Sequence, residues 1–241
     1  MKIIAYLFGI LSMLIIASCD KIDLDCETIE TAESLPIPDG TRIEIEGSEY
    51  FKYTLPSTIC KIIITDGNGT IHVEKGRETQ ISIPGYWVKE NGYNPFEITE
   101  ETITIHNTFS HSYLTLPEVC GVEIIDGNST TYLAKDFATG TVHYDIGGNS
   151  TLTFTEVTGE IEPIDALDFH VNLNVYRNGT YTGYGVNAGR VSAVLHSNGN
   201  VFARVADALI VDIPSNGTAY YKGYPSITST LSFQGELVDE N

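Results

Sequence analysis

A repeat at a nearly constant interval in residues 171–235 constrains the fold of this chain more than any other feature. Val171, Leu173 and Val175 alternate with mostly polar residues and precede an Asn-Gly turn. Comparable triplets, each followed by its own Asn-Gly or Gln-Gly turn, occupy residues 191–195, 209–213 and 227–231. Alternation with period 2 indicates strands, and short repeated units bury their apolar residues only by stacking on one another. The repeat therefore predicts an all-β fold, a right-handed parallel β-helix (β-solenoid) with coils of about 20 residues.

Stacking in register would place equivalent residues of successive triplets side by side on neighbouring strands. The first and last residues of the triplets then form two columns that hold the coils together. These columns are Val171/Val191/Leu209/Ile227 and Val175/Leu195/Ile213/Leu231.

The repeat also resembles a known family. The runs Gly189-Arg190-Val191, Ser197-Asn198-Gly199 and Tyr220-Tyr221-Lys222-Gly223-Tyr224-Pro225 are similar to Bacteroidota lipoproteins that carry a head GIN domain, the putative auto-transporter adhesins. The likeness covers residues 165–235, is weaker over 40–165, and is absent from 84–97. Turns here read Ser-Asn-Gly or Asp-Gly-Asn, where that family usually has Gly-Ser-Gly. The resemblance implies a β-solenoid exported on a lipid anchor, and it carries over no catalytic residues.

The first 18 residues have the pattern of a lipoprotein signal peptide. Lys2 precedes an apolar run at 3–16 that is too short to span a membrane. Ile16-Ala17-Ser18-Cys19 matches a bacterial lipobox, in which the cysteine thiol receives diacylglycerol. We therefore predict lipidation at Cys19, with an ordinary secretory peptide as the alternative. Residues 19–40 would form a flexible, lipidated tether, and residues 41–238 a single β-solenoid domain.

Acylation at Cys19 predicts an outer-membrane lipoprotein, because two or more acyl chains (palmitate among them) give stable anchoring. The acidic stretch that begins at Asp20 loosely resembles the surface-export signals of Bacteroidota lipoproteins, which favours exposure at the cell surface. Under the enterobacterial rule, the same Asp20 would retain the protein at the inner membrane. A periplasmic orientation thus stays open.

The chain is strongly acidic. It has 13 Lys and Arg against 32 Asp and Glu, a formal net charge of −19, and removal of Lys2 with the signal leaves 12 − 32 = −20. Nucleic acid is excluded as a partner, because phosphate binding requires basic surface. A solvated acidic surface explains this charge, with cation binding as the alternative.

A longer repeat decides the expected state of two cysteines. Residues 55–68 return as 116–128, so that Cys60 and Cys120 occupy equivalent positions sixty residues, or three coils, apart. Three coils correspond to roughly 14 Å, whereas a disulfide needs Cα atoms within about 7 Å. We therefore expect both cysteines to be free and buried, provided that the insertion at 84–97 leaves the coil count unchanged. Cys26, in the tether, stays unpaired or pairs between molecules.

The insertion at 84–97 holds the candidate ligand-binding residues. It contains the only Trp of the chain, and flat aromatic rings beside Asn and charged residues suit stacking on sugars. The alternative is that these rings cover the flank or a cap of the solenoid, because aromatic side chains mostly fill space. The candidate residues are Tyr86, Trp87, Tyr93 and Phe96.

Signals for catalysis, cofactors or metals do not emerge. Asp66-Gly67-Asn68-Gly69 resembles part of an EF-hand, but the loop would have Ile64 and Lys75 where two key ligands belong, so we interpret it as a tight turn. Asn residues at successive turns could form a hydrogen-bonded ladder. The leading hypothesis is a non-enzymatic envelope protein that binds glycans or host or envelope surface proteins. A self-associating structural protein (a homo-oligomer) is the alternative, followed by a carbohydrate-active enzyme that uses carboxylates on adjacent coils.

Overall fold

The computed structural model describes residues 35–86, 88, 96–106, 111–154 and 163–241, which belong to one compact unit, Glu33–Asn241. Residues 1–18, Cys19 and Cys26 lie outside the described residues. The strands are β1 (Thr41–Ile45), β2 (Ser48–Thr54), β3 (Lys61–Thr65), β4 (Thr70–Lys75), β5 (Gln80–Pro84), β6 (Phe96–Ile98), β7 (Thr102–His106), β8 (His111–Leu116), β9 (Gly121–Ile124), β10 (Thr130–Leu133), β11 (Thr141–Ile146), β12 (Thr151–Phe154), β13 (Ile164–Val175), β14 (Thr180–Leu195), β15 (Asn200–Ile213), β16 (Thr218–Lys222), β17 (Ser226–Leu231) and β18 (Glu236–Asp239). A 3-10 turn, η1 (Lys135–Phe137), follows β10.

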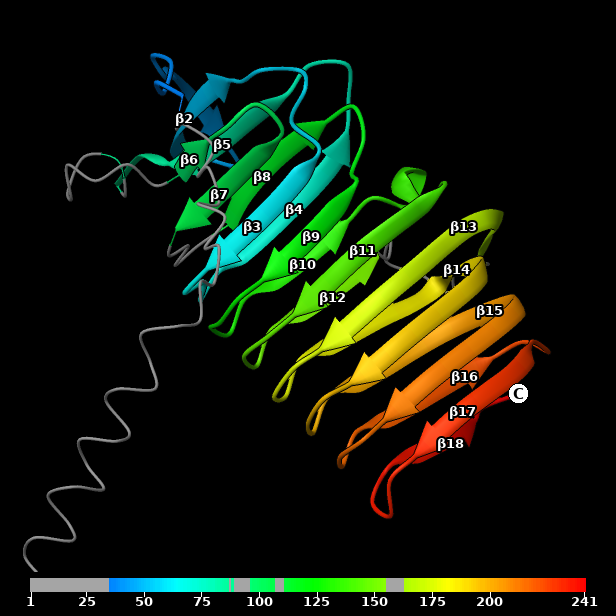
Figure 1. Cartoon of the computed structure of the whole chain (residues 1–241). Helices are drawn as coiled ribbons and strands as arrows, with labels where there is room; N and C mark the ends of the chain where they lie inside the picture. The colour runs from blue at the N-terminus through cyan, green and yellow to red at the C-terminus, as the bar shows by residue number, and fades with distance from the viewer. Residues whose placement is uncertain (1–34, 87, 89–95, 107–110, 155–162) are drawn as a thin grey trace, which may run out of the picture. The chain divides into compact units, whose positions relative to one another are not determined.

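These strands form one large sheet of 18 strands, connected throughout by hydrogen bonds (Figure 1). The expected all-β class is confirmed. The sheet is mixed, however, with antiparallel pairs among β1, β2, β5, β6, β7 and β8. The more specific expectation of a uniform right-handed parallel β-helix is therefore not confirmed.

Parallel pairs arrange most strands in two series. One series runs β7–β3–β9–β11–β13 and continues through the second halves of β14 and β15 to β17. The other runs β8–β4–β10–β12 and continues through the first halves of β14 and β15 to β16 and β18. The long strands β14 and β15 thus contribute to both series.

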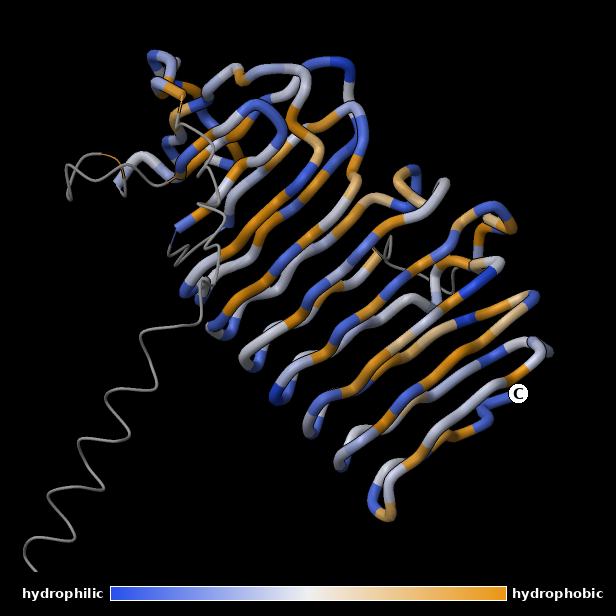
Figure 2. Tube along the Cα trace, in the orientation of Figure 1, coloured by the Kyte–Doolittle hydropathy of each residue, from blue (hydrophilic) through white to orange (hydrophobic). Residues whose placement is uncertain are grey.

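The register expected from the repeat is confirmed. Val171 pairs with Val191, Val191 with Leu209, and Leu209 with Ile227. In the second column, Val175 pairs with Leu195 and Ile213 with Leu231. Apolar and polar residues alternate along these strands (Figure 2), and the column residues of β13, β14 and β15 belong to one continuous core. Parallel in-register pairing places like residues together, so each inward position packs on its counterpart in the next strand.

An asparagine ladder joins the turns, as the sequence suggests. Each side-chain amide donates to the side-chain oxygen of the asparagine in the neighbouring turn, at 2.7–3.3 Å. The ladder comprises Asn68, Asn128, Asn149, Asn178, Asn198 and Asn216. These residues coincide with the turn positions of the repeat, which explains why asparagine recurs there.

The first strands follow a different plan. β1 and β2 form a hairpin whose turn residues, Glu46 and Gly47, both have positive φ, at 51° and 78°. Two consecutive positive φ values match the type I′ turn that fits the twist of a two-residue hairpin. β5 then lies between β2 and β8 and is antiparallel to both. The alternation of apolar residues at Ile81 and Ile83 therefore belongs to a strand with antiparallel neighbours.

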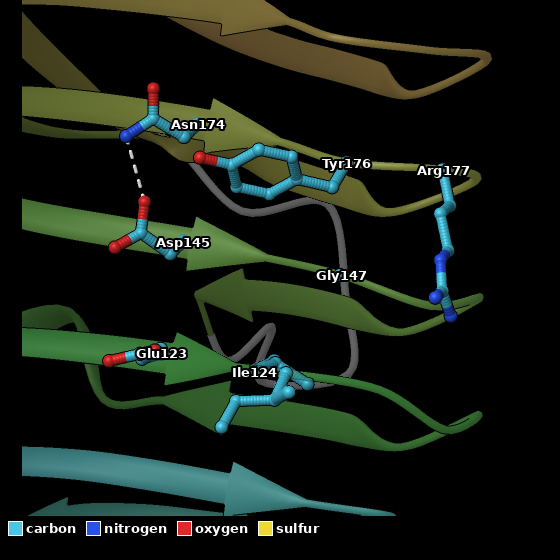
Figure 3. A pocket seen from close by; sticks show the side chains of 8 residues that line it. Glu123, Ile124, Asp145, Gly147, Asn174, Tyr176 and Arg177 are labelled. Carbon is cyan, nitrogen blue, oxygen red and sulfur yellow. Dashed lines mark hydrogen bonds between the residues drawn. The ribbon is translucent and has the colours of Figure 1, made fainter. Parts of the chain in front are cut away.

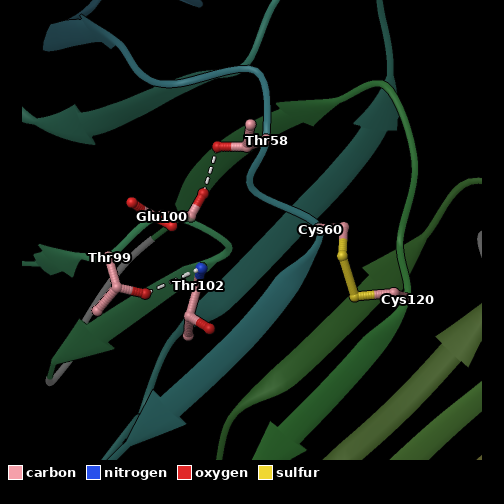
Figure 4. The surroundings of a disulfide bond; sticks show 6 residues. All are labelled: Thr58, Cys60, Thr99, Glu100, Thr102 and Cys120. Atoms are coloured by element: carbon pink, nitrogen blue, oxygen red, sulfur yellow. Dashed lines mark hydrogen bonds between the residues drawn. A yellow bond between two sulfur atoms is a disulfide. The ribbon is translucent and has the colours of Figure 1, made fainter. Parts of the chain in front are cut away.

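The expectation about Cys60 and Cys120 is wrong, because the two residues form a disulfide with a Cα–Cα distance of 5.2 Å (Figure 4). β3 pairs with β7 on one side and directly with β9 on the other, so sixty residues of sequence separate neighbouring strands. The chain leaves β4, adds β5 to β8 on the far side of β3 and β4, and returns to β9. The premise that three coils intervene therefore fails. Neither cysteine is buried, since Ile59 and Val119 take the inward positions.

Candidate ligand-binding site

A pocket of about 560 Å³ opens on the outer surface where β9, β11 and β13 end (Figure 3). Its volume falls within the range of small-molecule sites. It is lined by Glu123, Ile124, Ile125, Asp145, Gly147, Asn174, Tyr176 and Arg177.

Strand register brings the polar lining residues together. Asp145, on β11, is the paired neighbour of Glu123 on β9 and of Asn174 on β13. Side chains two residues apart on a strand point to the same face, so Ile125, Gly147 and Tyr176 follow on that side. Backbone hydrogen bonds keep them aligned: Gly147 N donates to Ile124 O at 2.7 Å, and Tyr176 N donates to Ile146 O at 2.8 Å.

Tyr176 and Ile125 form the two apolar walls. Their exposed fractions are 42% and 53%, high values for large apolar side chains. The ring of Tyr176 stacks on His196, with centroids 4.5 Å apart and planes inclined by 2°. His196 follows β14, on the side of Tyr176 away from Gly147, so one ring face is covered and the other faces the pocket.

Carboxylate and amide groups line the rest of the pocket. Asn174 Nδ2 donates to Asp145 Oδ1 at 2.8 Å, the contact drawn in Figure 3. Lys61 Nζ forms an ion pair with Glu123 Oε2 at 3.0 Å. Among the described residues Asp145 forms no ion pair, so its second oxygen stays available as an acceptor for a ligand.

Arg177 closes the turn side of the pocket. Its guanidinium donates to Asp126 Oδ2 at 2.6 Å, and the backbone N–H of Gly127 donates to Asp126 Oδ1 at 2.8 Å. The hydrogen bond from Arg177, followed by that from Gly127, lowers the pKa of the Asp126 carboxyl. The charge of Arg177 is thus already matched by an anion of the protein.

Of the ligand-binding residues proposed from the sequence, the structure describes Tyr86 and Phe96, and neither lines this pocket. Tyr86 is exposed to 47%, whereas Phe96 is fully buried and packs edge-on against Tyr53 at a centroid distance of 5.1 Å. A buried ring offers no face to a sugar, and Phe96 belongs to the hydrophobic core. Trp87, Tyr93 and Cys19 lie outside the described residues.

Sequence reasoning missed the pocket although a signal was present. Glu123, Asp145 and Asn174 each occupy the outward position just before the last inward residue of their strand. Aligning the strands by their last inward residues, Ile124, Ile146 and Val175, would have placed the three side chains in one row. At the next outward position, the three segments have Ile125, Gly147 and Tyr176, so only the middle one lacks a side chain.

A second cluster of aromatic rings is less suited to ligands. His72 stacks on His111, Tyr113 and Tyr132, with centroids 5.1–5.5 Å apart and planes inclined by 8–19°. Burial, followed by the charge of His111, lowers the pKa of His72. Because these rings cover one another, their faces are used within the protein. No group of three or more metal-ligating side chains occurs in the part of the chain that the structure describes.

Comparisons with known proteins identify the fold but not the family. No protein-family model matches the chain, and no curated protein matches it in sequence. A putative adhesin from Bacteroides fragilis NCTC 9343 has a similar structure, with a TM-score of 0.54, 14% identity, and coverage of 79% of this chain and 96% of that one. A putative adhesin from Parabacteroides distasonis ATCC 8503 gives a TM-score of 0.46 at 10% identity, covering 80% of this chain and 97% of the other. At such identity, the likeness to the Bacteroides fragilis protein shows a shared fold.

The described residues include no helix that is long and apolar enough to cross a membrane.

Proposed function

We propose that this chain is a non-enzymatic, lipid-anchored binding protein of the cell envelope that captures glycans in the pocket of β9, β11 and β13. The single observation that carries the proposal is the combination in one pocket of a free tyrosine face with hydrogen-bonding side chains. Sugars present apolar C–H faces and hydroxyl groups together, and a site for them needs both kinds of contact.

The envelope location rests on the N-terminal sequence. Residues 1–18 would direct export, Cys19 would carry the acyl chains, and residues 19–40 would tether the body to the outer membrane. The fold shared with a putative adhesin of Bacteroides fragilis supports a role at the cell surface. The resemblance of the repeat to the head GIN lipoproteins supports the same location. Protease treatment of intact cells, with a periplasmic protein as leakage control, tests this. Cleavage supports surface exposure, and protection of both proteins contradicts it.

Glycan binding is tested on the purified full chain with a panel of immobilised polysaccharides and host glycans. We expect binding that Tyr176→Ala reduces at least tenfold. Tyr220→Ala is the matched control, because Tyr220 also stacks face to face on a neighbour, Phe202 at 4.7 Å, but lies outside the pocket. Equal binding by wild type and Tyr176→Ala would refute the assignment of the pocket.

Two carboxylates on adjacent strands, Glu123 and Asp145, are the observation that favours a carbohydrate-active enzyme. Lys61 forms an ion pair with Glu123, and Asn174 donates a hydrogen bond to Asp145. Both contacts stabilise the ionised carboxylates, which can accept hydrogen bonds but cannot act as the proton donor that glycoside hydrolysis needs. We therefore expect no reducing sugar to be released from any polysaccharide that the protein binds.

Self-association is the second candidate function. β17 pairs only with β15 among the described residues and exposes Ile227 to 42% and Leu231 to 43%. An edge of this kind can pair with another chain. Light scattering over a range of protein concentrations tests it, since a structural envelope protein would form concentration-dependent oligomers and a monomeric binding protein would not.

A further inference from the structure

The strand that forms the floor of the pocket contributes no side chain where its neighbours contribute large ones. Gly147 lies between Ile125 and Tyr176, aligned with them by backbone hydrogen bonds. A Cβ atom at Gly147 would lie 2.4 Å from Ile125 O, so any other residue would require the backbone to move. Close approach of the strands thus demands glycine here, and the same glycine leaves a slot between the two walls.

The width of the slot follows from strand spacing. Ile125 and Tyr176 are separated by two spacings of about 4.8 Å, or about 9.6 Å. A ring inserted between the two side chains makes a van der Waals contact of about 4 Å with each of them. The distance that remains corresponds to the thickness of one puckered ring. Two stacked rings would need a further spacing, so the slot admits a single ring.

Polar groups beside the slot define what the ring must carry. Asp145, at the floor, accepts from Asn174 with one oxygen, and a carboxylate can only accept hydrogen bonds. A ligand must therefore donate, and two adjacent hydroxyl groups on a ring can share one carboxylate.

The charges disfavour acidic sugars. Arg177 is the only cation among the residues that line the pocket, and it is paired with Asp126. Lys61, at the edge, is paired with Glu123. A carboxylate on the ligand would lie near Glu123 and Asp145 without a free cation, and like charges in a pocket repel.

We propose that the pocket takes one neutral pyranose ring, inserted between Ile125 and Tyr176 above Gly147, with adjacent hydroxyl groups on the Asp145 carboxylate. This ring is a terminal sugar of a larger glycan, because both walls enclose it. The inference rests on the proposed glycan-binding function and narrows it to a single-ring, uncharged ligand.

Competition with simple sugars tests the proposal. The probes are methyl glycosides of glucose, galactose and mannose, each compared with the corresponding uronic acid. Ligand-observed NMR on the full chain measures binding, and competition against the glycan-panel signal measures displacement. We expect at least one neutral methyl glycoside to bind and displace the glycan, at least tenfold better than its uronic acid.

Two variants examine the slot itself. Ile125→Trp fills it from an exposed wall position and should abolish binding of the methyl glycoside. Asp145→Asn keeps the shape of the side chain but removes its charge, and should lower the affinity for the neutral methyl glycoside about tenfold. It should also reduce the ratio between the affinities for the neutral sugar and the uronic acid. Asp212→Asn, at an exposed position on β15 outside the pocket, is the control and should leave binding unchanged.

The outcomes separate the two proposals. If wild type binds no glycan, or binds glycans equally well without Tyr176, the proposed function fails. If glycans bind through Tyr176 but no methyl glycoside competes, if uronic acids bind best, or if Ile125→Trp binds normally, then glycan binding stands and the single-ring slot is overturned.

Discussion

The N-terminal region (Thr41–Leu116) and the C-terminal region (Ile164–Asp239) use the same alternating pattern to make different pairings. In the C-terminal region, successive strands pair in parallel at intervals of 17 to 22 residues, and of 18 to 20 for Val171, Val191 and Leu209. In the N-terminal region, β2, β5 and β8 pair antiparallel, and β3 pairs with β9 sixty residues later. Alternation decides which face of a strand is buried but not which strand lies beside it.

The largest effect is expected where a column of the C-terminal region is fully buried. Leu195→Asp places an unpaired charge at a position with no exposed surface, and should lower the free energy of unfolding by about 4 kcal/mol or more. Leu231→Asp, in the same column but 43% exposed, should cost less than about 1 kcal/mol. Urea denaturation compares the two variants. Equal losses would show that burial does not distinguish β17 from the inner strands of this column.

The disulfide tests how the N-terminal region is held together. Cys60 and Cys120 close a loop of sixty residues, so a Cys60→Ser/Cys120→Ser double variant should lose about 2–4 kcal/mol. Because Cys120 is exposed, added reductant should lower the melting temperature of the wild type to that of the variant. Intact mass spectrometry checks that the bond is present beforehand. A melting temperature unaffected by either change would show that strand pairing alone holds β3 beside β9.

How far the sequence predicts the structure differs between the regions for a physical reason. The interval of 18 to 20 residues at Val171, Val191 and Leu209 leaves too little chain for any neighbour except the next repeat. After β4, the chain is long enough to add β5 to β8 on the other side of β3 and β4 and then return to β9. The separation of Cys60 and Cys120 in the sequence therefore does not predict the distance between them in space. The pocket was missed because its residues come from three strands and only register brings them together.

The asparagine ladder provides a finer measure, because it runs through both regions. Asn149 donates to Asn128 and accepts from Asn178, whereas Asn216 only donates, to Asn198. Asn149→Ala should therefore destabilise the protein by about 1 kcal/mol, and Asn216→Ala by about half as much. Chemical denaturation of both variants measures the ratio. Equal effects would mean that the asparagines act through turn geometry rather than through their mutual hydrogen bonds.

The smallest effect concerns the ion pair that connects the segment after β9 with the turn after β13. Arg177 lowers the pKa of Asp126, so this carboxyl stays ionised in the folded protein at pH values where the unfolded chain begins to take up a proton. A carboxyl with a lowered folded-state pKa stabilises the protein above its unfolded value, here 3.8, and the stabilisation disappears as the pH falls through the folded-state pKa. The advantage of wild type over Asp126→Asn should thus be greatest near pH 7 and vanish at the acid end, in urea midpoints measured from pH 7 to pH 2. Asp212→Asn, which removes a carboxylate without an ion pair among the described residues, serves as the reference. If Asp126→Asn follows the same pH dependence as this reference, the ion pair does not stabilise the contact between the two turns.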